Sequence, residues 1–142
     1  MATKTSCPII PTMRYHDAPA AIDWLCRAFG FERHLVVPDG QGGIAHAQLV
    51  FRGGMIMLGS ARNDAFGELQ KTPRDVGGVG TQSACVLIDD ADAHHARAVA
   101  AGARVVRPPT NEEYGGRGYA CHDPEGHLWY FGTYDPWAEA GA

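Results

Sequence analysis

The sequence predicts an α+β fold made of two tandem β-α-β-β-β modules in a single domain. Its 142 residues suffice for one ordinary domain and are too few for two. An amphipathic helix pattern occurs twice, each time between an aspartate and a glycine. One β-type segment precedes each helix pattern and three follow it, which indicates a repeat of one structural unit.

The first helix pattern lies in "HDAPAAIDWLCRAFGF". Asp17 is a suitable N-cap, apolar side chains recur on one face, and Gly30 can end the helix. The second pattern, "DDADAHHARAVAAGARV", has Asp89 or Asp90 as its cap and Gly102 as its end. Both segments therefore predict a short helix with the same signals at its two ends.

A constant offset relates the two modules. With Asp89 as the second cap, the offset from Asp17 is 72 positions (89 − 17 = 72). The same offset aligns Gly54 with Gly126 (126 − 54 = 72), so each module should end in a glycine-containing turn and an apolar strand.

The expected strands alternate polar and apolar residues or are rich in β-branched and aromatic ones. A pair of prolines, Pro108 and Pro109, should stop the second strand of the second module. The segment 61–80, rich in Gly, Asp and Arg, is the expected linker between a first module at about 7–60 and a second at about 81–135. The expected strands are 7–15, 33–37, 44–51 and 55–59, then 83–88, 104–109, 118–122 and 127–131.

Two motifs carry a resemblance to a known family. They are the helix pattern D-x-x-x-A-I-D-W…A-F-G-F, beginning at Asp17, and the turn and strand D-P-x-G-H, beginning at Asp123. Together with the tandem modules they resemble the vicinal oxygen chelate superfamily, the glyoxalase, bleomycin-resistance and extradiol-dioxygenase group, from about Pro8 to Tyr134. The stretches "IAHAQL" and "AVAAGARVVRPP" are similar to its PhnB-like branch.

The resemblance implies that the two sheets pair into an incomplete barrel whose concave cup holds a ligand, with helices on the convex faces. It also implies a homodimer, since members of the group are commonly dimers. In metal-dependent members, two side chains from each module hold a divalent ion in the cup.

The positions implied for these metal ligands carry unsuitable side chains here. In the first module they fall on Ile10 and Leu58. In the second they fall on Ser83, or Gln82 with a shift of one residue, and on Tyr130. Divalent ions require imidazole, carboxylate or thiolate donors in convergent sets. We therefore predict no metal site at the usual positions, and no cofactor.

His46 and Gln48 are the main polar residues expected inside the cup, because alternation in "IAHAQLVF" places them opposite Ala47 and Leu49. Three roles remain open for His46: a water-bonded side chain, a ligand-contacting hydrogen bonder or general base, and a metal ligand. Tyr130 is a candidate acid or base partner. The expected cup wall comprises Ile10, His46, Gln48, Leu58, Leu128 and Tyr130, whereas Met55 and Met57 are expected in the core. Trp24 is expected in the core or over the interface between the modules.

The loop "NEEYGGRGY" supplies two further candidate ligand-binding residues, Tyr114 and Arg117. An arginine flanked by aromatic residues can hold a carboxylate or phosphate through two hydrogen bonds and stack on a planar group. The alternative is a surface ion pair of Arg117 with Glu112 or Glu113, which contributes little energy.

Five of the other histidines have structural explanations. On the second helix, His94 and His95 should be solvated. Near turns, His16 and His122 should form local hydrogen bonds. On the last strand, His127 should pack under the helices with Trp129 and Phe131.

Composition excludes several classes of protein. The 12 basic residues are scattered and are outnumbered by 16 acidic ones, which argues against a nucleic-acid partner. No apolar run or signal segment indicates a membrane, so a cytoplasmic protein is expected. Its four cysteines form no C-x-x-C pair and should be reduced and mostly buried, with a catalytic thiol as a minor alternative. Trp137 is a candidate for docking on a partner subunit.

The sequence thus favours a metal-independent protein that binds a small organic ligand, sequestering an antibiotic or a metabolite. The competing hypothesis is an enzyme of the same superfamily. Such an enzyme would be a metal-dependent lyase, isomerase or dioxygenase that uses His46, or a metal-free catalyst with His46 and Tyr130 as acid and base. The chemical identity of the ligand is not encoded in any motif.

Overall fold

A computed structural model describes residues 7–138 and contains the two predicted modules. The first consists of β1 (Thr12–Tyr15), α1 (Ala18–Phe29), β2 (Glu32–Pro38), β3 (Ile44–Phe51) and β4 (Gly54–Ser60). Two short 3-10 helices, η1 (Phe66–Glu68) and η2 (Pro73–Val76), lie in the linker. The second consists of β5 (Ala84–Leu87), α2 (Ala91–Ala100), β6 (Arg104–Asn111), β7 (Arg117–His122) and β8 (Leu128–Gly132).

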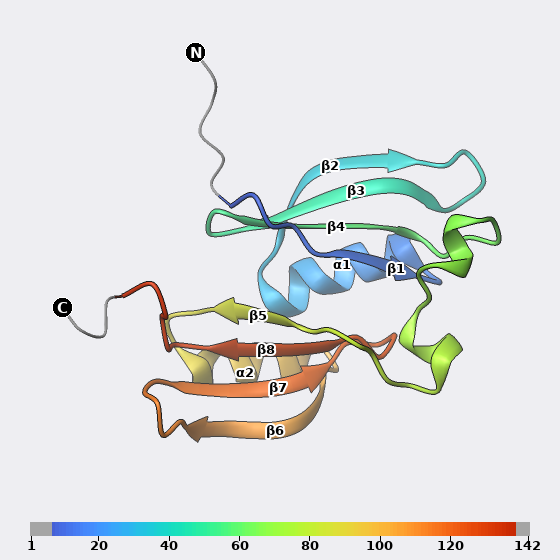
Figure 1. The fold of residues 1–142 in the computed structure, drawn as a ribbon. Helices are drawn as coiled ribbons and strands as arrows, with labels where there is room; N and C mark the ends of the chain where they lie inside the picture. The colour runs from blue at the N-terminus through green and yellow to red at the C-terminus, as the bar shows by residue number, and fades with distance from the viewer. Residues whose placement is uncertain (1–6, 139–142) are drawn as a thin grey trace, which may run out of the picture.

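Each module forms a four-stranded mixed sheet, with strand orders β1-β4-β3-β2 and β5-β8-β7-β6. The first strand of each module pairs in parallel with the last, and the other pairs are antiparallel. In Figure 1 the two sheets lie one above the other, with α2 behind the second sheet. The predicted α+β fold of two β-α-β-β-β modules is thus confirmed.

Both helices begin at an aspartate. The Asp17 carboxylate accepts a hydrogen bond from Ala20 N at 3.1 Å, and the Asp90 carboxylate accepts one from Ala93 N at 3.0 Å. These bonds satisfy amide groups that lack partners in the first turn of a helix. Of the two predicted caps for α2, Asp90 is therefore the one used.

A shared core joins the two modules. Phe29, at the end of α1, packs its ring against Trp129 and Phe131 of β8, with centroid distances of 5.3 and 4.5 Å. Trp24 of α1 donates from Nε1 to the carbonyl of Ala101, after α2, at 2.7 Å. Burying each large aromatic side chain contributes roughly 2–3 kcal/mol, so α1 fixes the position of the second module as well as its own.

Asp123 ties β1 to β8. Its side chain is only 4% exposed, and its Oδ2 accepts from the Tyr15 hydroxyl at 2.6 Å and from Trp129 Nε1 at 3.0 Å. Its Oδ1 accepts from the backbone amides of Glu125 and His127. Because a buried carboxylate is tolerated only when it is well hydrogen bonded, this turn holds both modules in one arrangement.

His127 is structural, as predicted. Its Nε2 lies 2.8 Å from the carbonyl oxygen of Arg14 and its ring packs on Tyr15. His122 forms the expected local bond, with Nδ1 3.0 Å from Gly126 O. His16 instead has a distant partner, the Asp75 carboxylate in the linker, at 2.9 Å, because the linker folds back against the start of α1.

The prediction that β4 turns Leu58 toward the cup is wrong. Leu58 pairs with Ala47, and both are buried in the core. Met57 pairs with Gln48, and Met55 lies two positions before Met57, so both methionines share the face of Gln48. The predicted orientations of Leu58 and of the two methionines are therefore exchanged.

The reason is an error of one residue in the assumed offset. Because Asp90 is the cap, the offset from Asp17 is 73 (90 − 17 = 73). The last strands show the same value, since Met13 pairs with Leu58 and Val86 with Phe131 (131 − 58 = 73). In a strand a shift of one residue moves every side chain to the opposite face.

Two further predictions on strands and helices are corrected. Strand β6 does not stop at Pro108 but continues to Asn111. It lies at the edge of its sheet, and its register shifts between Arg107 and Thr110, so the prolines cost no hydrogen bonds to a second neighbour.

His94 is not solvated. Its Nδ1 lies 2.6 Å from the Tyr119 hydroxyl and its Nε2 2.9 Å from Phe29 O, and burial lowers its pKa. His95 also packs against Tyr119 and is only half-exposed. Because α2 is rich in alanine, a larger side chain is needed to fill the space between the helices and β7.

Among the cysteines, only Cys121 is buried, while Cys7 and Cys85 are exposed and Cys26 is intermediate, so the prediction of mostly buried thiols is wrong. All four are free. Burial raises the pKa of Cys121 to about 12, which argues against a reactive thiolate there. The helices within 7–138 are all too short or too polar to span a bilayer. Trp137 is 88% exposed, and the homodimer stays a prediction.

Candidate ligand-binding faces

Each sheet has one face turned away from the core, which we call its open face. On the first sheet the pairs Gln48–Met57 and His46–Val37 lie on this face, opposite the buried pair Ala47–Leu58. On the second sheet Tyr130 pairs with Ala120 there, whereas its neighbours in β8 are buried. The open face of the first sheet comprises Thr12, Arg14, Leu35, Val37, His46, Gln48, Met55, Met57 and Gly59, and that of the second Cys85, Arg104, Arg107, Gly118, Ala120, His122, Leu128, Tyr130 and Gly132.

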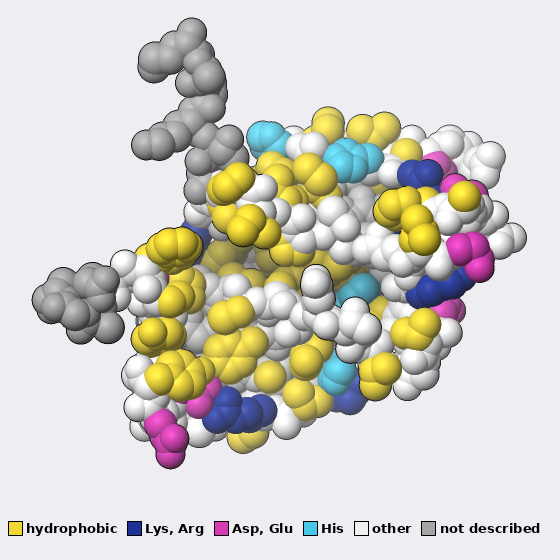
Figure 2. Space-filling model, in the orientation of Figure 1, with side chains coloured by type: hydrophobic (Ala, Val, Ile, Leu, Met, Phe, Trp, Pro, Cys, Tyr) yellow, Lys and Arg dark blue, Asp and Glu magenta, His cyan; other side chains and the backbone are white. Residues whose placement is uncertain are grey.

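Apolar side chains predominate among the groups on these faces that reach solvent. Leu35, Val37 and Leu128 are about 40% exposed, and Met55 and Met57 are partly exposed. Figure 2 shows hydrophobic side chains reaching the surface on both halves of the molecule. Exposed apolar groups gathered on one side of a protein are typical of a binding surface.

His46 and Gln48 are neighbours on the open face of the first sheet, as predicted. Their Nε2 atoms are 3.0 Å apart. This distance is within hydrogen-bond range, so the two side chains are polar partners of one another on this face.

The open face of the second sheet contains a connected polar network. Two nitrogens of Arg107 donate to the two oxygens of the Glu112 carboxylate, each at 2.7 Å. The Tyr130 hydroxyl donates to the same carboxylate, and the Tyr114 hydroxyl lies 3.4 Å from that of Tyr130. The Glu112 side chain is only 6% exposed, so its charge is enclosed by its partners.

These contacts fix the charges of the network at neutral pH. Hydrogen bonds, from Arg107 first and then from Tyr130, lower the pKa of Glu112 to about 2. Burial, and the Glu112 carboxylate beside it, raise the pKa of Tyr130 well above its usual value. Glu112 is therefore a carboxylate and Tyr130 a neutral phenol over the whole physiological range.

The ring of Tyr130 lies flat on two glycines. A Cβ atom at Gly118 would come within 2.2 Å of the Tyr130 hydroxyl oxygen, and one at Gly132 within 2.8 Å of its ring. Gly118 and Gly132 are paired across β7 and β8. The absence of side chains at both positions thus creates the shelf on which the ring rests.

Arg117 does not lie on this face, so its predicted role as a ligand clamp is wrong. It alternates with Gly118 and shares the side of the buried Tyr119. Its guanidinium donates to the Asp92 carboxylate at the start of α2, at 3.1 and 3.2 Å, and to Asn111. The alternative partner, Glu112 or Glu113, is also wrong, because Glu112 is bound to Arg107.

Sequence reasoning missed Arg107 and the role of Glu112. Because the expected strand ended at the prolines, no sequence signal indicated that Arg107 and the turn containing Glu112 lie close together. The remaining predicted residues fall in two groups, His46 with Gln48 and Tyr114 with Tyr130 and Leu128, and within 7–138 no hydrogen bond joins the groups. Ile10 precedes β1 and Ser83 precedes β5. No cluster of three or more His, Cys, Asp or Glu suited to a metal ion is present in the described part of the chain.

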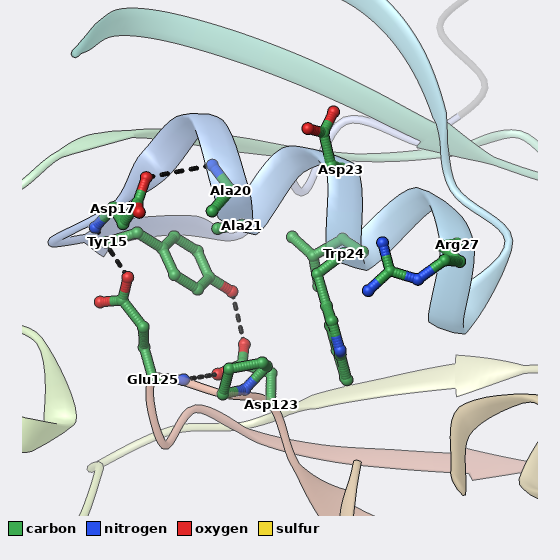
Figure 3. A pocket seen from close by; sticks show the side chains of 11 residues that line it. Tyr15, Asp17, Ala20, Ala21, Asp23, Trp24, Arg27, Asp123 and Glu125 are labelled. Carbon is green, nitrogen blue, oxygen red and sulfur yellow. Dashed lines mark hydrogen bonds between the residues drawn. The ribbon is translucent and has the colours of Figure 1, made fainter. Parts of the chain in front are cut away.

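A separate cavity of about 450 Å³ lies between α1 and the turn after β7. Figure 3 shows Tyr15, Trp24 and Asp123 along its wall. The polar atoms of all three are already hydrogen bonded within the protein. Its lining also includes Asp17, Asp23, Arg27 and Glu125, so the charged groups along this cavity are mainly acidic.

Comparison with known proteins places the fold in a family. TioX from Micromonospora sp. ML1 is similar in structure, with a TM-score of 0.70 and 32% identity over 89% of this chain and 98% of that one. The uncharacterized proteins Rv0887c of Mycobacterium tuberculosis (strain ATCC 25618 / H37Rv) and Mb0911c of Mycobacterium bovis (strain ATCC BAA-935 / AF2122/97) are each 32% identical over 132 residues. The match spans 93% of this chain and 77% and 86% of theirs.

The fosfomycin resistance protein FosX from Mesorhizobium loti, 16% identical, has a TM-score of 0.61 over 92% of this chain and 94% of that one, and so shares the fold. The PhnB-like branch stays a prediction. A family profile, described as the Glyoxalase/Bleomycin resistance protein/Dioxygenase superfamily, matches residues 11–131, and the chain belongs to that superfamily.

Proposed function

We propose that this protein binds a small organic molecule without a metal ion, and sequesters an antibiotic or a metabolite in that way. The observation that carries the proposal is the state of Glu112, a carboxylate on an open face. Two N–H groups of Arg107 and the hydroxyl of Tyr130 already occupy it. An arginine thus neutralises the charge that a cation would neutralise in a metal site.

The strand positions implied by the resemblance support this proposal. Tyr130 takes the place of a carboxylate in the second module. With the corrected offset its counterpart in the first module is Met57 (130 − 57 = 73), and a thioether is a weak ligand for hard divalent ions. His46 Nε2 lies 3.0 Å from the Gln48 amide nitrogen. The two groups on these faces best suited to hold a metal ion, Glu112 and His46, therefore already have partners within the protein.

The apolar surroundings support a small organic ligand. Leu35, Val37 and Leu128 are exposed on the open faces around a few polar groups. A largely apolar wall with a small number of polar side chains is the usual composition of a small-molecule site. Members of the superfamily include antibiotic resistance proteins. This analogy supports an antibiotic as one class of ligand and names no particular compound.

The alternative of a metal-free acid–base enzyme has less support. An efficient general acid or base has a pKa near the working pH. The pKa of Glu112 is lowered to about 2, and that of Tyr130 is raised far above neutrality by burial and by Glu112. Tyr130, the predicted partner of His46 in that mechanism, therefore does not exchange a proton readily at pH 7, and neither does the Glu112 carboxylate bound to it.

The experiment is a fluorescence titration with phenylnaphthylamine, an uncharged apolar dye, before and after dialysis against EDTA. We expect saturable binding at a defined stoichiometry that EDTA leaves unchanged. Tyr130→Ala, which removes the ring from its glycine shelf, should weaken binding several-fold. The matched control is Tyr134→Ala, since Tyr134 contacts Tyr114 but lies outside the network with Glu112.

Binding that disappears with EDTA, or a stoichiometric metal ion retained through purification and lost in His46→Ala, would return the protein to the metal-dependent enzymes. Turnover of a substrate by metal-free protein would instead establish the acid–base alternative.

A further inference from the structure

Arg14 differs from the other arginines of the described chain. Most of those form an ion pair with a carboxylate or donate to a backbone carbonyl, and the exceptions, Arg27 and Arg104, are exposed on the surface. Arg14 is half-buried and donates to no residue within 7–138. Its Nε is the single buried side-chain nitrogen or oxygen of the described residues without a hydrogen-bond partner. A half-buried cation without an acceptor is costly, which calls for an explanation.

The position of the Arg14 guanidinium is well defined despite this lack of acceptors. Arg14 pairs with Gly59 of β4 on the open face of the first sheet. A Cβ atom at Gly59 would come within 2.6 Å of Arg14 Nη1, so the side chain lies directly over the glycine. The ring of Phe66, from η1 in the linker, lies 5.0 Å from Arg14 Cζ.

The guanidinium thus contacts the backbone at Gly59 and the aromatic ring of Phe66. An aromatic ring contacts a guanidinium on its flat face and leaves the N–H groups along its edge available.

The electrostatic surroundings of Arg14 are positive. Burial lowers its pKa first, Arg62 lowers it further by repulsion, and Asp64 opposes both. Asp64 lies 3.6 Å from Arg62, its nearest cationic partner. The two arginines and one aspartate leave one positive charge without a counter-charge, next to Met57 and the His46–Gln48 pair on the same open face.

We propose that Arg14, with Phe66 over it and Arg62 beside it, forms an oxyanion subsite for the ligand. It would take the carboxylate, or an equivalent sulfonate, of an otherwise apolar molecule whose body lies against Met57 and its neighbours. This inference rests on the proposed function and adds the chemical class of the ligand, an apolar organic anion. Binding supplies the acceptors that the Arg14 edge lacks and neutralises the excess charge.

The two other candidate sites are less suited to an anion. Arg107 is already paired with Glu112 through two bonds. The cavity under α1 has four acidic residues, Asp17, Asp23, Asp123 and Glu125, and a single arginine, Arg27, along its lining.

The test compares two dyes on the full-length protein: anilinonaphthalene sulfonate, an anion, and phenylnaphthylamine, its uncharged parent. Arg14→Gln should weaken binding of the sulfonate about tenfold or more, the usual effect of a lost charge-assisted contact. Binding of the uncharged dye should change less than about twofold. Raised salt should weaken the sulfonate alone in the wild-type protein, because it screens an exposed charge.

Three further variants define the mechanism. Arg14→Lys should restore only part of the sulfonate affinity, since an ammonium lacks the planar edge. Arg62→Gln, with Arg14 intact, should weaken the sulfonate several-fold. Arg27→Gln removes an exposed arginine of α1 and should leave both dyes unchanged. Thermal unfolding of each variant confirms that it is folded.

The outcomes separate the two proposals. If both dyes bind the wild-type protein and neither Arg14→Gln nor Arg62→Gln changes the ratio of their affinities, the oxyanion subsite is overturned. The small-molecule site would then remain in place. Failure of both dyes to bind the wild-type protein would overturn the proposed function together with the subsite.

Discussion

The open faces of the two sheets share one structural feature, a planar side chain packed on glycine, but differ in charge. On each, a planar side chain packs closely over glycine: Tyr130 over Gly118 and Gly132, and Arg14 over Gly59. In the second module the group on the shelf is neutral and its network is closed. In the first it is a cation with no acceptor among the described residues.

The difference lies in the acids close to each face. Glu112 comes from the turn after β6 and is bound by Arg107 and Tyr130. The nearest acid to Arg14 is Asp64, which has its own ion pair with Arg62. The two modules have one topology but differ in charge. The open face of the second is neutral, whereas that of the first keeps the positive charge of Arg14, which on our proposal binds a ligand.

The largest effect is expected from breaking the joint that fixes the two faces. Asp123→Ala leaves the Tyr15 hydroxyl and the Trp129 indole without an acceptor in the core. Because each orphaned donor costs about 1–3 kcal/mol, we expect a loss of about 3–5 kcal/mol in the free energy of unfolding. Urea denaturation measures it.

Asp89→Ala is the control for this variant, since Asp89 is almost fully exposed and should matter little. A loss below about 1 kcal/mol for Asp123→Ala would mean that the modules are held by packing alone.

The glycine shelves should respond unequally to a methyl group. At Gly118 the new Cβ would meet Tyr130 and, at 2.7 Å, the backbone oxygen of Phe131, so Gly118→Ala should cost about 2–3 kcal/mol. At Gly59 it would meet the flexible end of Arg14 at 2.6 Å and a backbone oxygen, that of Ala45, only at 3.1 Å, so Gly59→Ala should cost less, about 1–2 kcal/mol. Thermal or urea unfolding checks the order, and equal losses would contradict a rigid second face.

Removing the Glu112 carboxylate from its network with Arg107 and Tyr130 should give the second open face an unpaired arginine, as on the first. The folded-state pKa of Glu112 is lowered to about 2 from its ordinary value of 4.5. Its contribution to stability is therefore complete above pH 4.5 and is lost as the pH falls toward 2. Glu112→Gln should reduce stability at pH 7 and flatten the decline in this acid range, as measured by denaturation at several pH values.

The same variant leaves Arg107 without its carboxylate. Glu112→Gln should therefore strengthen binding of anilinonaphthalene sulfonate. Unchanged binding would mean that charge alone does not make a face receptive to anions.

The smallest effect on stability is expected for Arg14→Met. The substitution removes a half-buried donor without a partner and keeps an apolar stem over Gly59. Since no folded-state hydrogen bond is lost, the free energy of unfolding should change by about 1 kcal/mol or less. An increase would show that the unpartnered Arg14 destabilises the fold. A loss as large as that of Asp123→Ala would show that Arg14 stabilises the fold instead of serving a ligand.

Much of the fold could be predicted from local signals. Asp17 and Gly30 delimit α1, and "IAHAQLVF" is β3 with Ala47 and Leu49 inside, because caps and alternation are properties of neighbouring residues. The face of β4 could not be obtained in this way. It depended on choosing between Asp89 and Asp90 as a cap, and one residue exchanged Leu58 with Met57.

The sites were predicted less completely, because they depend on which side chains meet across strands. Tyr130 and Tyr114 were separate candidates from a strand and a loop, and only the structure brings their hydroxyl groups together, whereas Arg117 was assigned to the wrong side of β7. Its alternation with Tyr119 was the available signal, since a buried tyrosine places its neighbours two positions away on the same side.

By itself the sequence determined the two modules, their helices and most strand boundaries, because these follow from propensities and periodicities within a few residues. Only the tertiary structure decided that Glu112 belongs to Arg107, that His94 bridges the helices, and that Arg14 is left without an acceptor. Hydrogen bonds and ion pairs act over a few ångströms, so their partners are set by the packing of the sheets, the helices and the linker and not by position along the chain.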